Sequence, residues 1–291
     1  MSLNRKSFTY ADPHQSLPTR LFIQAVESLT GKGKLWSVYR EYQKEPKKDG
    51  EFFWAAALRK LNISAEYDVS KLENIPKEGG LLVLANHPFG IADGLVLCDL
   101  VSRQRPDHKI LINSVLRHAE EAKPLMLPID FSGTREAIET NLQSRKDARQ
   151  WLKDGHCLIV FPAGGVSDIG VWGNKVAWDR AWQPFVGSLI KQTKPTILPV
   201  YIEGQNSTLF QWASVTAMFL RLALFLRETV LRMNGTVKLH FGKTIAYEAL
   251  PEGAERDELC DYLYAELYAL GGHEDAQPFL PPFRTEFKVY S

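Results

Sequence analysis

A chain of 291 residues with 45% hydrophobic and 11% aromatic residues can fold around a sizeable core, which excludes a disordered protein. Its 35 basic and 34 acidic residues give a formal charge of +1, so the overall charge gives no support for a nucleic-acid partner. The cysteines at positions 98, 157 and 260 are too far apart for a metal site or a disulfide framework, and they indicate buried thiols in a reducing compartment.

The first 65 residues predict a helical segment packed on the main domain. Apolar residues recur at helical spacing from Leu17 to about Tyr42, with a break at Gly31 and Gly33. Residues 51–62 have the pattern of a third helix. We therefore expect an N-terminal helical segment over 1–65 and one further domain over 66–291.

From residue 66 onward, short apolar runs alternate with helical stretches. The runs cover 81–86, 109–116, 156–164, 196–204 and 236–245, and one long helical stretch covers 135–155. Such runs, bounded by Gly, Pro or Asn, are typical of buried strands. The alternation predicts an α/β fold with a mixed, mostly parallel sheet flanked by helices, in which ligands bind at the carboxyl ends of strands.

The first candidate site is the sequence NHPFGIADG at 86–94, directly after one of these runs. Asp93 follows His87 by six positions, across a proline and a glycine, so it can reach back to one ring nitrogen. The carboxylate would then fix the tautomer and strengthen the other nitrogen as a base for a hydroxyl. The alternative is structural, with His87 and Asp93 serving only the start of the next helix.

The second candidate site is the sequence FPAGGVSD at 161–168, again after an apolar run. Gly164 and Gly165 allow backbone N–H groups to approach an anionic or carbonyl oxygen. Ser167 or Asp168 is placed to begin a helix whose N-terminus favours negative charge. The alternative is an ordinary tight turn. Aromatic residues that follow either line an acyl groove or belong to the core: Trp172, Trp178, Trp182 and Phe185.

Four ordered blocks, NHPFGIADG (86–94), PLMLPIDFSGTREA (124–137), FPAGGVSD (161–168) and ILPVYIEG (197–204), resemble the motifs of the glycerolipid, or lysophospholipid, acyltransferase family. The likeness extends from Leu81 to Ile245 and is strongest to the subgroup of hemolysin-type and lyso-ornithine-lipid acyltransferases. It implies a glycerol-3-phosphate acyltransferase-like fold. The residues that match are His87 as general base and Asp93 as its orienting carboxylate, with a substrate site formed by Asn86, Phe161, Pro162, Gly164, Gly165 and Ser167.

The resemblance also implies a reaction. A fatty acyl group would move from acyl-CoA or acyl carrier protein, as co-substrate, to a hydroxyl of lyso-ornithine lipid or another lyso-lipid, with no metal or other cofactor. His87 would accept the hydroxyl proton, and N–H groups near the glycine pair would stabilise the oxyanion. Two rivals remain. A thioesterase or lipase lacks support because no G-x-S-x-G elbow is present, and a non-catalytic lipid-binding protein would leave His87 and Asp93 unexplained.

The chain departs from the family pattern at three points. Five residues separate His87 and Asp93 where the family has four, and the extra residue can be taken up at Gly90. Ala163 and Val166 stand where the family has the Glu and Arg that help to bind glycerol phosphate, so a bidentate phosphate partner is lost. The first candidate for a replacement head-group contact is Arg135, unless it is a solvated arginine at a helix start. Weaker candidates are Lys175, Arg180, Asp130 and Glu203.

Residues 209–233 predict a single apolar helix that lies on a membrane surface. Arg221, Glu228 and Arg232 fall near one face of this helix, whereas Trp212 and Phe219 lie on the broad apolar side. The alternative is a helix buried in the protein whose arginines reach the surface. The N-terminus has no apolar leader, and no run of 18 uncharged apolar residues occurs. We expect a cytoplasmic protein bound peripherally to the inner face of the cytoplasmic membrane.

Overall fold

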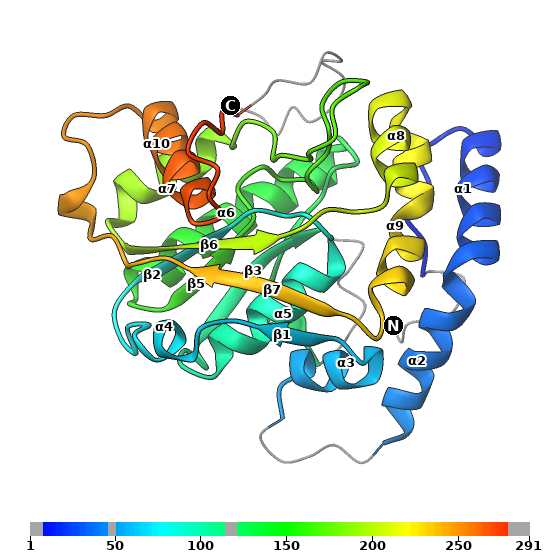
Figure 1. The fold of residues 1–291 in the computed structure, drawn as a ribbon, viewed down its shortest axis with the longest axis horizontal. Coiled ribbons are helices and arrows are strands. Elements are labelled where there is room, and N and C mark those ends of the chain that lie inside the picture. Colours follow the sequence, from blue (N-terminus) through cyan, green and yellow to red (C-terminus); the bar gives the residue numbers. More distant parts are fainter. Residues whose placement is uncertain (1–7, 46–50, 114–120, 279–291) are drawn as a thin grey trace.

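A computed structural model describes residues 8–45, 51–113 and 121–278, and its centre is a seven-stranded sheet in the order β1-β7-β6-β2-β5-β3-β4 (Figure 1). The strands are β1 (Ser64–Glu66), β2 (Leu81–Ala85), β3 (His108–Asn113), β4 (Met126–Ile129), β5 (Cys157–Val160), β6 (Thr196–Glu203) and β7 (Thr236–Phe241). Neighbouring strands are parallel except β6 and β7, so β1 and β7 run against the other five. The predicted mixed, mostly parallel sheet is confirmed.

Helices cover both faces of the sheet (Figure 1). They are α1 (Leu17–Thr30), α2 (Lys32–Lys44), α3 (Phe53–Leu61), α4 (Val69–Glu73), α5 (Ile91–Ser102), α6 (Arg135–Lys153), α7 (Pro184–Thr193), α8 (Thr208–Thr216), α9 (Met218–Arg232) and α10 (Arg256–Ala269). Side chains of α2, α3, α5 and α9 share one core with the sheet, and those of α6, α7 and α10 share the other. The helices α1 to α3, in the segment predicted to be helical, pack on α9 and α5.

The central strand β2 shows why its sequence is a continuous apolar run. Leu81, Val83 and Ala85 enter the core under α5, whereas Leu82 and Leu84 enter the core under α6, α7 and α10. All five residues are fully buried. A strand with helices on both faces has no position left for a polar side chain.

Each of the five predicted strands is present, with shifted ends. The strand predicted over 156–164 stops at Val160, because the turn at Gly164 and Gly165, which we call the glycine turn, leaves the sheet. Positions 114–116 of the run 109–116 lie outside the described residues. The short strands β1 and β4 were not predicted; β4 has only four residues, one of them a proline. The three cysteines are buried and unpaired, as predicted.

The prediction of a single helix over 209–233 is wrong. Ala217 has an extended backbone (φ −161°, ψ 141°) that ends α8 and precedes α9. Arg221 and Glu228 point into the protein, each only 4% exposed. They are turned inward because Arg221 pairs with Asp168 and Glu228 accepts hydrogen bonds from Ser207. None of the described helices combines the length and the apolar character needed to cross a membrane.

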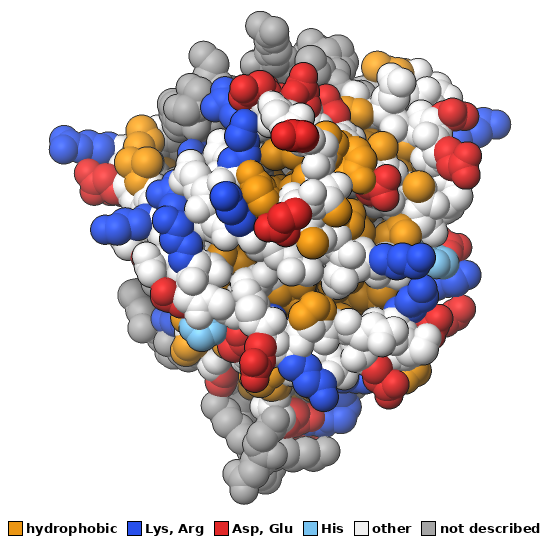
Figure 2. Space-filling model, turned by 90° about the vertical axis from the view of Figure 1, so that its left-hand side faces the viewer, with side chains coloured by type: hydrophobic (Ala, Val, Ile, Leu, Met, Phe, Trp, Pro, Cys, Tyr) orange, Lys and Arg blue, Asp and Glu red, His pale blue; other side chains and the backbone are white. Residues whose placement is uncertain are grey.

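Large hydrophobic side chains are exposed where α1, α8 and α9 lie together, at the right of Figure 1. We call this set the apolar surface: Leu21, Phe22, Trp172, Leu209, Trp212 and Phe219. The rings of Phe22 and Phe219 are 5.5 Å apart and those of Trp172 and Trp212 are 6.0 Å apart, which joins the elements across this surface. On the opposite side, seen in Figure 2, Lys, Arg, Asp and Glu side chains surround a centre with hydrophobic groups.

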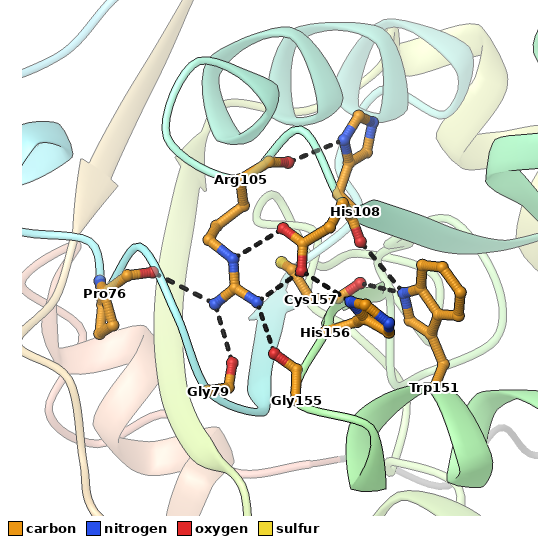
Figure 3. Close-up of polar contacts among 9 residues, drawn as sticks. Pro76, Gly79, Arg105, His108, Trp151, Gly155, His156 and Cys157 are labelled. Atoms are coloured by element: carbon orange, nitrogen blue, oxygen red, sulfur yellow. Dashed lines mark hydrogen bonds and ion pairs between the residues drawn. The ribbon is translucent and has the colours of Figure 1, made fainter.

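Arg105 ties together the amino-terminal edge of the sheet (Figure 3). Its guanidinium, 1% exposed, donates to the carbonyls of Pro76, Gly79 and Gly155 and to both oxygens of Asp107. These acceptors immediately precede β2, β5 and β3. Because every contact lies at the strand starts, this cluster holds the sheet and leaves the opposite, carboxyl edge for the motif residues.

Candidate functional site

His87 leaves the carboxyl end of β2, and Asp93 lies in the first turn of α5. Nδ1 of His87 is 3.0 Å from Oδ2 of Asp93, which is fully buried. The same oxygen accepts the backbone N–H groups of Phe89 (2.8 Å) and Gly90 (2.9 Å). The ring is not aligned to donate a hydrogen bond to the carboxylate, as is common in unliganded sites. Asp93 therefore holds the turn and stands beside the imidazole.

Gly90 makes this turn possible. Its φ of 82° and ψ of −116° belong to a region that other residues rarely adopt. A β-carbon there would also lie 3.4 Å from a methyl group of Val166, in the second motif. The additional residue between His87 and Asp93 is thus accommodated in a loop that contains this glycine.

The ring of His87 stacks on Phe161, with centroids 4.0 Å apart and planes inclined by 23°. Phe161 follows β5, the sheet neighbour of β2, so the two motifs meet at adjacent strand ends. Asp93 lies on the Nδ1 side of the ring. Nε2 therefore faces away from the carboxylate, and the His87 side chain, 18% exposed, borders a large cavity.

The second motif forms a turn, and the prediction that Ser167 or Asp168 begins a helix is wrong. Gly164 has a φ of 70°, and its N–H donates to the carbonyl of Phe161 (3.0 Å). Asp168 instead pairs with Trp178 through two backbone hydrogen bonds. The next helix, α7, begins only at Pro184, because the chain first folds back on itself through this bridge.

Asp179 is a site residue that the motif search missed. Its fully buried Oδ1 accepts the backbone N–H of His87 (3.2 Å) and the hydroxyl of Ser167 (2.6 Å). Burial raises the pKa of Asp179 to about 6, although these hydrogen bonds and the nearby His87 lower it. The available signal was an acidic residue inside the aromatic sequence WDRAW at 178–182.

Arg221 is a second missed residue of the site. Its Nη1 lies 2.6 Å from Oδ2 of Asp168, and its Nη2 donates to the carbonyl of Val166. Arg180 binds the same oxygen of Asp168 at 2.8 Å. Burial lowers the pKa of Arg221. We call these three residues the arginine pair cluster: Arg180, Arg221 and Asp168. Helical periodicity placed Arg221 on a polar stripe but could not tell that this stripe faces inward.

A cavity of about 1340 Å³ lies in front of His87. Polar and backbone groups border it, among them Arg20, Gly164, Gly165 and Arg221. Apolar side chains of α2, α3, α5, β3 and β4 also border it: Leu35, Val38, Trp54, Leu61, Leu95, Ile110 and Met126. A cavity of this size with both kinds of lining has room for an apolar ligand that also carries polar groups.

The structure brings together only some of the predicted substrate-binding residues. Phe161, Pro162, Gly164 and Gly165 border the cavity with His87. The Asn86 side chain is bonded to the backbone of Ile202 on β6, at 2.8 and 2.6 Å, and Ser167 is bonded to Asp179. These two side chains are therefore occupied in holding the strand ends.

Among the head-group candidates, the Arg135 side chain is 88% exposed and pairs with Glu139, and it does not border the cavity. Asp130 borders the cavity, whereas Glu203, at the carboxyl end of β6, pairs with Lys238 and His240 and does not border it. Of the predicted aromatic groove, Phe185 borders the cavity, Trp172 is exposed, and Trp178 and Trp182 pack on tyrosines of α10. Among the described residues there is no group of three or more His, Cys, Asp or Glu side chains that could hold a metal.

The chain is similar to several known proteins. A family model described as Acyltransferase matches residues 34–271. The chain is 26% identical to a lyso-glycine lipid O-acyltransferase of Bacteroides thetaiotaomicron over 72% of this chain and 76% of that one. It is 24% identical to a protein of the same description from Phocaeicola vulgatus, over 72% and 74%. The crystal structure of a 1-acyl-sn-glycerophosphate acyltransferase, PlsC, from Thermotoga maritima superposes with a TM-score of 0.47 at 16% identity, covering 89% of this chain and 96% of that one.

Proposed function

The chain belongs to the acyltransferase family, and on this basis we propose that it moves a fatty acyl group from a thioester to a hydroxyl of a lyso-lipid, with His87 as general base. The observation that carries the proposal is the contact of 3.0 Å between His87 and Asp93 at the edge of a large cavity that many apolar side chains border. Two relatives are described as lyso-glycine lipid O-acyltransferases, so the acceptor we propose is a lyso-lipid with an amino-acid head group such as glycine.

The proposed reaction is a direct transfer. Nε2 of His87 accepts the proton of the acceptor hydroxyl while its oxygen attacks the thioester carbonyl. Asp93 stabilises the imidazolium that forms. The attack forms the C–O bond of the new ester. Collapse of the tetrahedral intermediate then restores the carbonyl and breaks the C–S bond, and the departing thiolate takes the proton from His87. The donor is acyl-CoA or acyl carrier protein, and the reaction needs no further cofactor.

The glycine turn suits the negative charge that develops in this reaction. Gly165 and Val166 follow the turn, and neither backbone N–H donates a hydrogen bond to an acceptor in the described part of the chain. Such N–H groups stabilise a tetrahedral oxyanion, and loss of one donor typically costs about 10²- to 10³-fold in kcat. We propose these two N–H groups as the oxyanion-binding groups.

We further propose that the protein binds peripherally to the inner face of the cytoplasmic membrane. Support comes from the apolar surface, where Trp212 and Phe219 are 52% and 38% exposed. Exposed tryptophan and phenylalanine beside leucines are typical of groups that enter the headgroup region of a bilayer. The face that contacts lipid is thus the apolar side of α8 and α9, and not the inward-facing arginine side.

The test is acyl transfer by the purified protein, followed by mass spectrometry of the product. His87→Ala is expected to lower kcat by about 10²- to 10⁴-fold without a change in melting temperature. His240→Ala, which removes a histidine outside the cavity, is the matched control. Substantial activity of the His87 variant contradicts the mechanism. Release of free fatty acid whether or not acceptor is present supports a hydrolase, and failure to use any thioester supports a lipid-binding protein.

A further inference from the structure

The arginine pair cluster has one positive charge in excess. Two guanidinium groups share a single carboxylate, and the side chains of Arg221 and Asp168 are 5% and 1% exposed. A buried cation without a full counter-charge is costly, and burial accordingly lowers the pKa of Arg221. An anionic group bound beside Arg221 would balance this charge.

Arg221 is open to the cavity on one side. Its Nη1 and Nη2 bond to Asp168 and Val166, and the guanidinium has five N–H groups. Within the described ranges, no acceptor is bonded to its other three N–H groups. The residue borders the cavity, whereas Arg180 does not. Arg180 therefore holds Asp168, and Arg221 faces the substrate.

The position of Arg221 relative to the reaction centre is set by short contacts. A β-carbon at Gly165 would lie 3.9 Å from its Nη2, so this glycine lies next to the guanidinium. Arg221 bonds to the carbonyl of Val166, and the next residue, Ser167, donates its N–H to the carbonyl of His87 (2.8 Å). The Arg221 guanidinium therefore lies beside the glycine turn. Val166 and Ser167 connect it to the backbone of His87.

A second arginine, Arg20 on α1, borders the same cavity. Its Nε is buried, and no described residue accepts a hydrogen bond from it. Helices α1 and α9 pack side by side, with Phe22 against Phe219, so Arg20 and Arg221 enter the cavity from neighbouring helices. Both are planar donors suited to a carboxylate or a phosphate.

We propose that Arg221 binds the carboxylate of the acceptor head group and so selects lyso-lipids that end in a carboxylate. This inference rests on the proposed function. The excess charge of the cluster is balanced by one carboxylate, and Arg20 offers further planar donors at the same cavity. The family has an arginine at the position of Val166. In this chain Arg221, which bonds to the Val166 carbonyl, places a cation next to the glycine turn instead.

The experiment uses two acceptors that differ only in the head group: lyso-glycine lipid and its neutral N-methylamide. The wild-type protein is expected to favour the carboxylate in kcat/KM by about 10- to 150-fold, the range for a charged hydrogen bond. Arg221→Gln is expected to remove this preference, so that kcat/KM for the two acceptors differs by less than about threefold. Arg221→Lys, which keeps the charge but loses the planar fork, should show an intermediate preference.

Arg227→Gln is the matched control, because Arg227 lies on the same helix, pairs with Glu228 and does not border the cavity. Its acceptor preference should equal that of wild type. If Arg221→Gln does not fold, the wild-type preference and the Arg221→Lys variant decide the question.

Several results would overturn the inference. Equal use of both acceptors by the wild-type protein, or an equal loss of both in Arg221→Gln, means that Arg221 is only structural. If Arg221→Gln raises only the KM of the acyl donor, Arg221 binds the donor and not the acceptor. If the wild-type protein prefers lysophosphatidic acid, Arg221 binds a phosphate and not a carboxylate. Equal transfer to both acceptors leaves the proposed function standing, whereas transfer to neither removes the proposed function as well.

Discussion

The backbone N–H of His87 donates to Oδ1 of Asp179 at 3.2 Å, although 92 positions separate these residues in the sequence. The same oxygen accepts the Ser167 hydroxyl, and the Ser167 N–H donates to the carbonyl of His87. One buried carboxylate therefore joins the histidine loop to the glycine turn. The position of His87 relative to the glycine turn depends on this link.

Asp179→Asn is expected to change how stability depends on pH. Burial raises the pKa of Asp179 from 3.8 to about 6. A carboxyl with a raised pKa binds its proton more tightly in the folded state than in the unfolded state. Its contribution to the free energy of unfolding is therefore complete below the unfolded pKa and declines as pH rises through the folded pKa. Between about pH 4 and 6 the free energy of unfolding of the wild-type protein should fall by on the order of 1 to 3 kcal/mol because Asp179 loses its proton. The asparagine variant, which stays neutral and still accepts hydrogen bonds, should not show this decline.

The measurement is the free energy of unfolding in denaturant between pH 4 and pH 8. Asp99→Asn is the control, since Asp99 forms an ion pair with Arg103 at the far end of α5 and does not contact the site. The control should keep the wild-type pH dependence. An unchanged slope in Asp179→Asn would show that another group titrates.

Arg105→Lys is expected to destabilise the fold without changing the reaction. A lysine cannot reach three carbonyls and both carboxylate oxygens at once, so buried acceptors lose their partners, at a cost of about 3 to 5 kcal/mol. Chemical denaturation measures this loss. The activity of the folded fraction should equal that of wild type because the cluster lies at the amino edge of the sheet (Figure 3).

Arg103→Lys is the matched substitution two residues away, where the side chain is 51% exposed. It should change stability by less than about 0.5 kcal/mol. An equal effect of the two substitutions, or a large loss of activity in folded Arg105→Lys, would contradict the assigned role.

Trp212→Asp is expected to weaken binding to lipid vesicles about tenfold or more. The indole is 52% exposed on the apolar surface, and an aspartate there would have to enter the headgroup region. Co-sedimentation with vesicles measures the binding. Leu142→Asp offers a control of similar exposure, 60%, on α6 in the other helical layer. Equal binding by both variants would remove the apolar surface as the membrane contact.

Much of the fold follows from local patterns. A strand between two helical layers needs apolar residues at every position, so the runs around Leu82, Ile159 and Leu198 are visible in the sequence. The turn containing Gly90 and Asp93 was also predictable, because its contacts lie within six residues of His87. The motifs at 86–94 and 161–168, which carry the family resemblance, are likewise formed by residues close together in the sequence.

The direction of the amphipathic stripe on α9 was decided only by the tertiary structure. Periodicity shows that Arg221 and Glu228 share a face, but not whether that face meets solvent, lipid or protein. Here it meets Asp168, which lies 53 residues before Arg221, and Ser207, which lies on the other side of the break at Ala217.

The sequence by itself determined the apolar strand segments of the α/β fold, the histidine and carboxylate pair, and the glycine turn, because each of these arises from residues close together in the chain. The tertiary structure decided which distant charges complete the site. Asp179 and Arg221 reach it across 92 residues from His87 and 53 residues from Asp168. Ion pairs and buried hydrogen bonds depend on distance in space, which no local period encodes, so these two residues emerged only when the strands and loops were placed together.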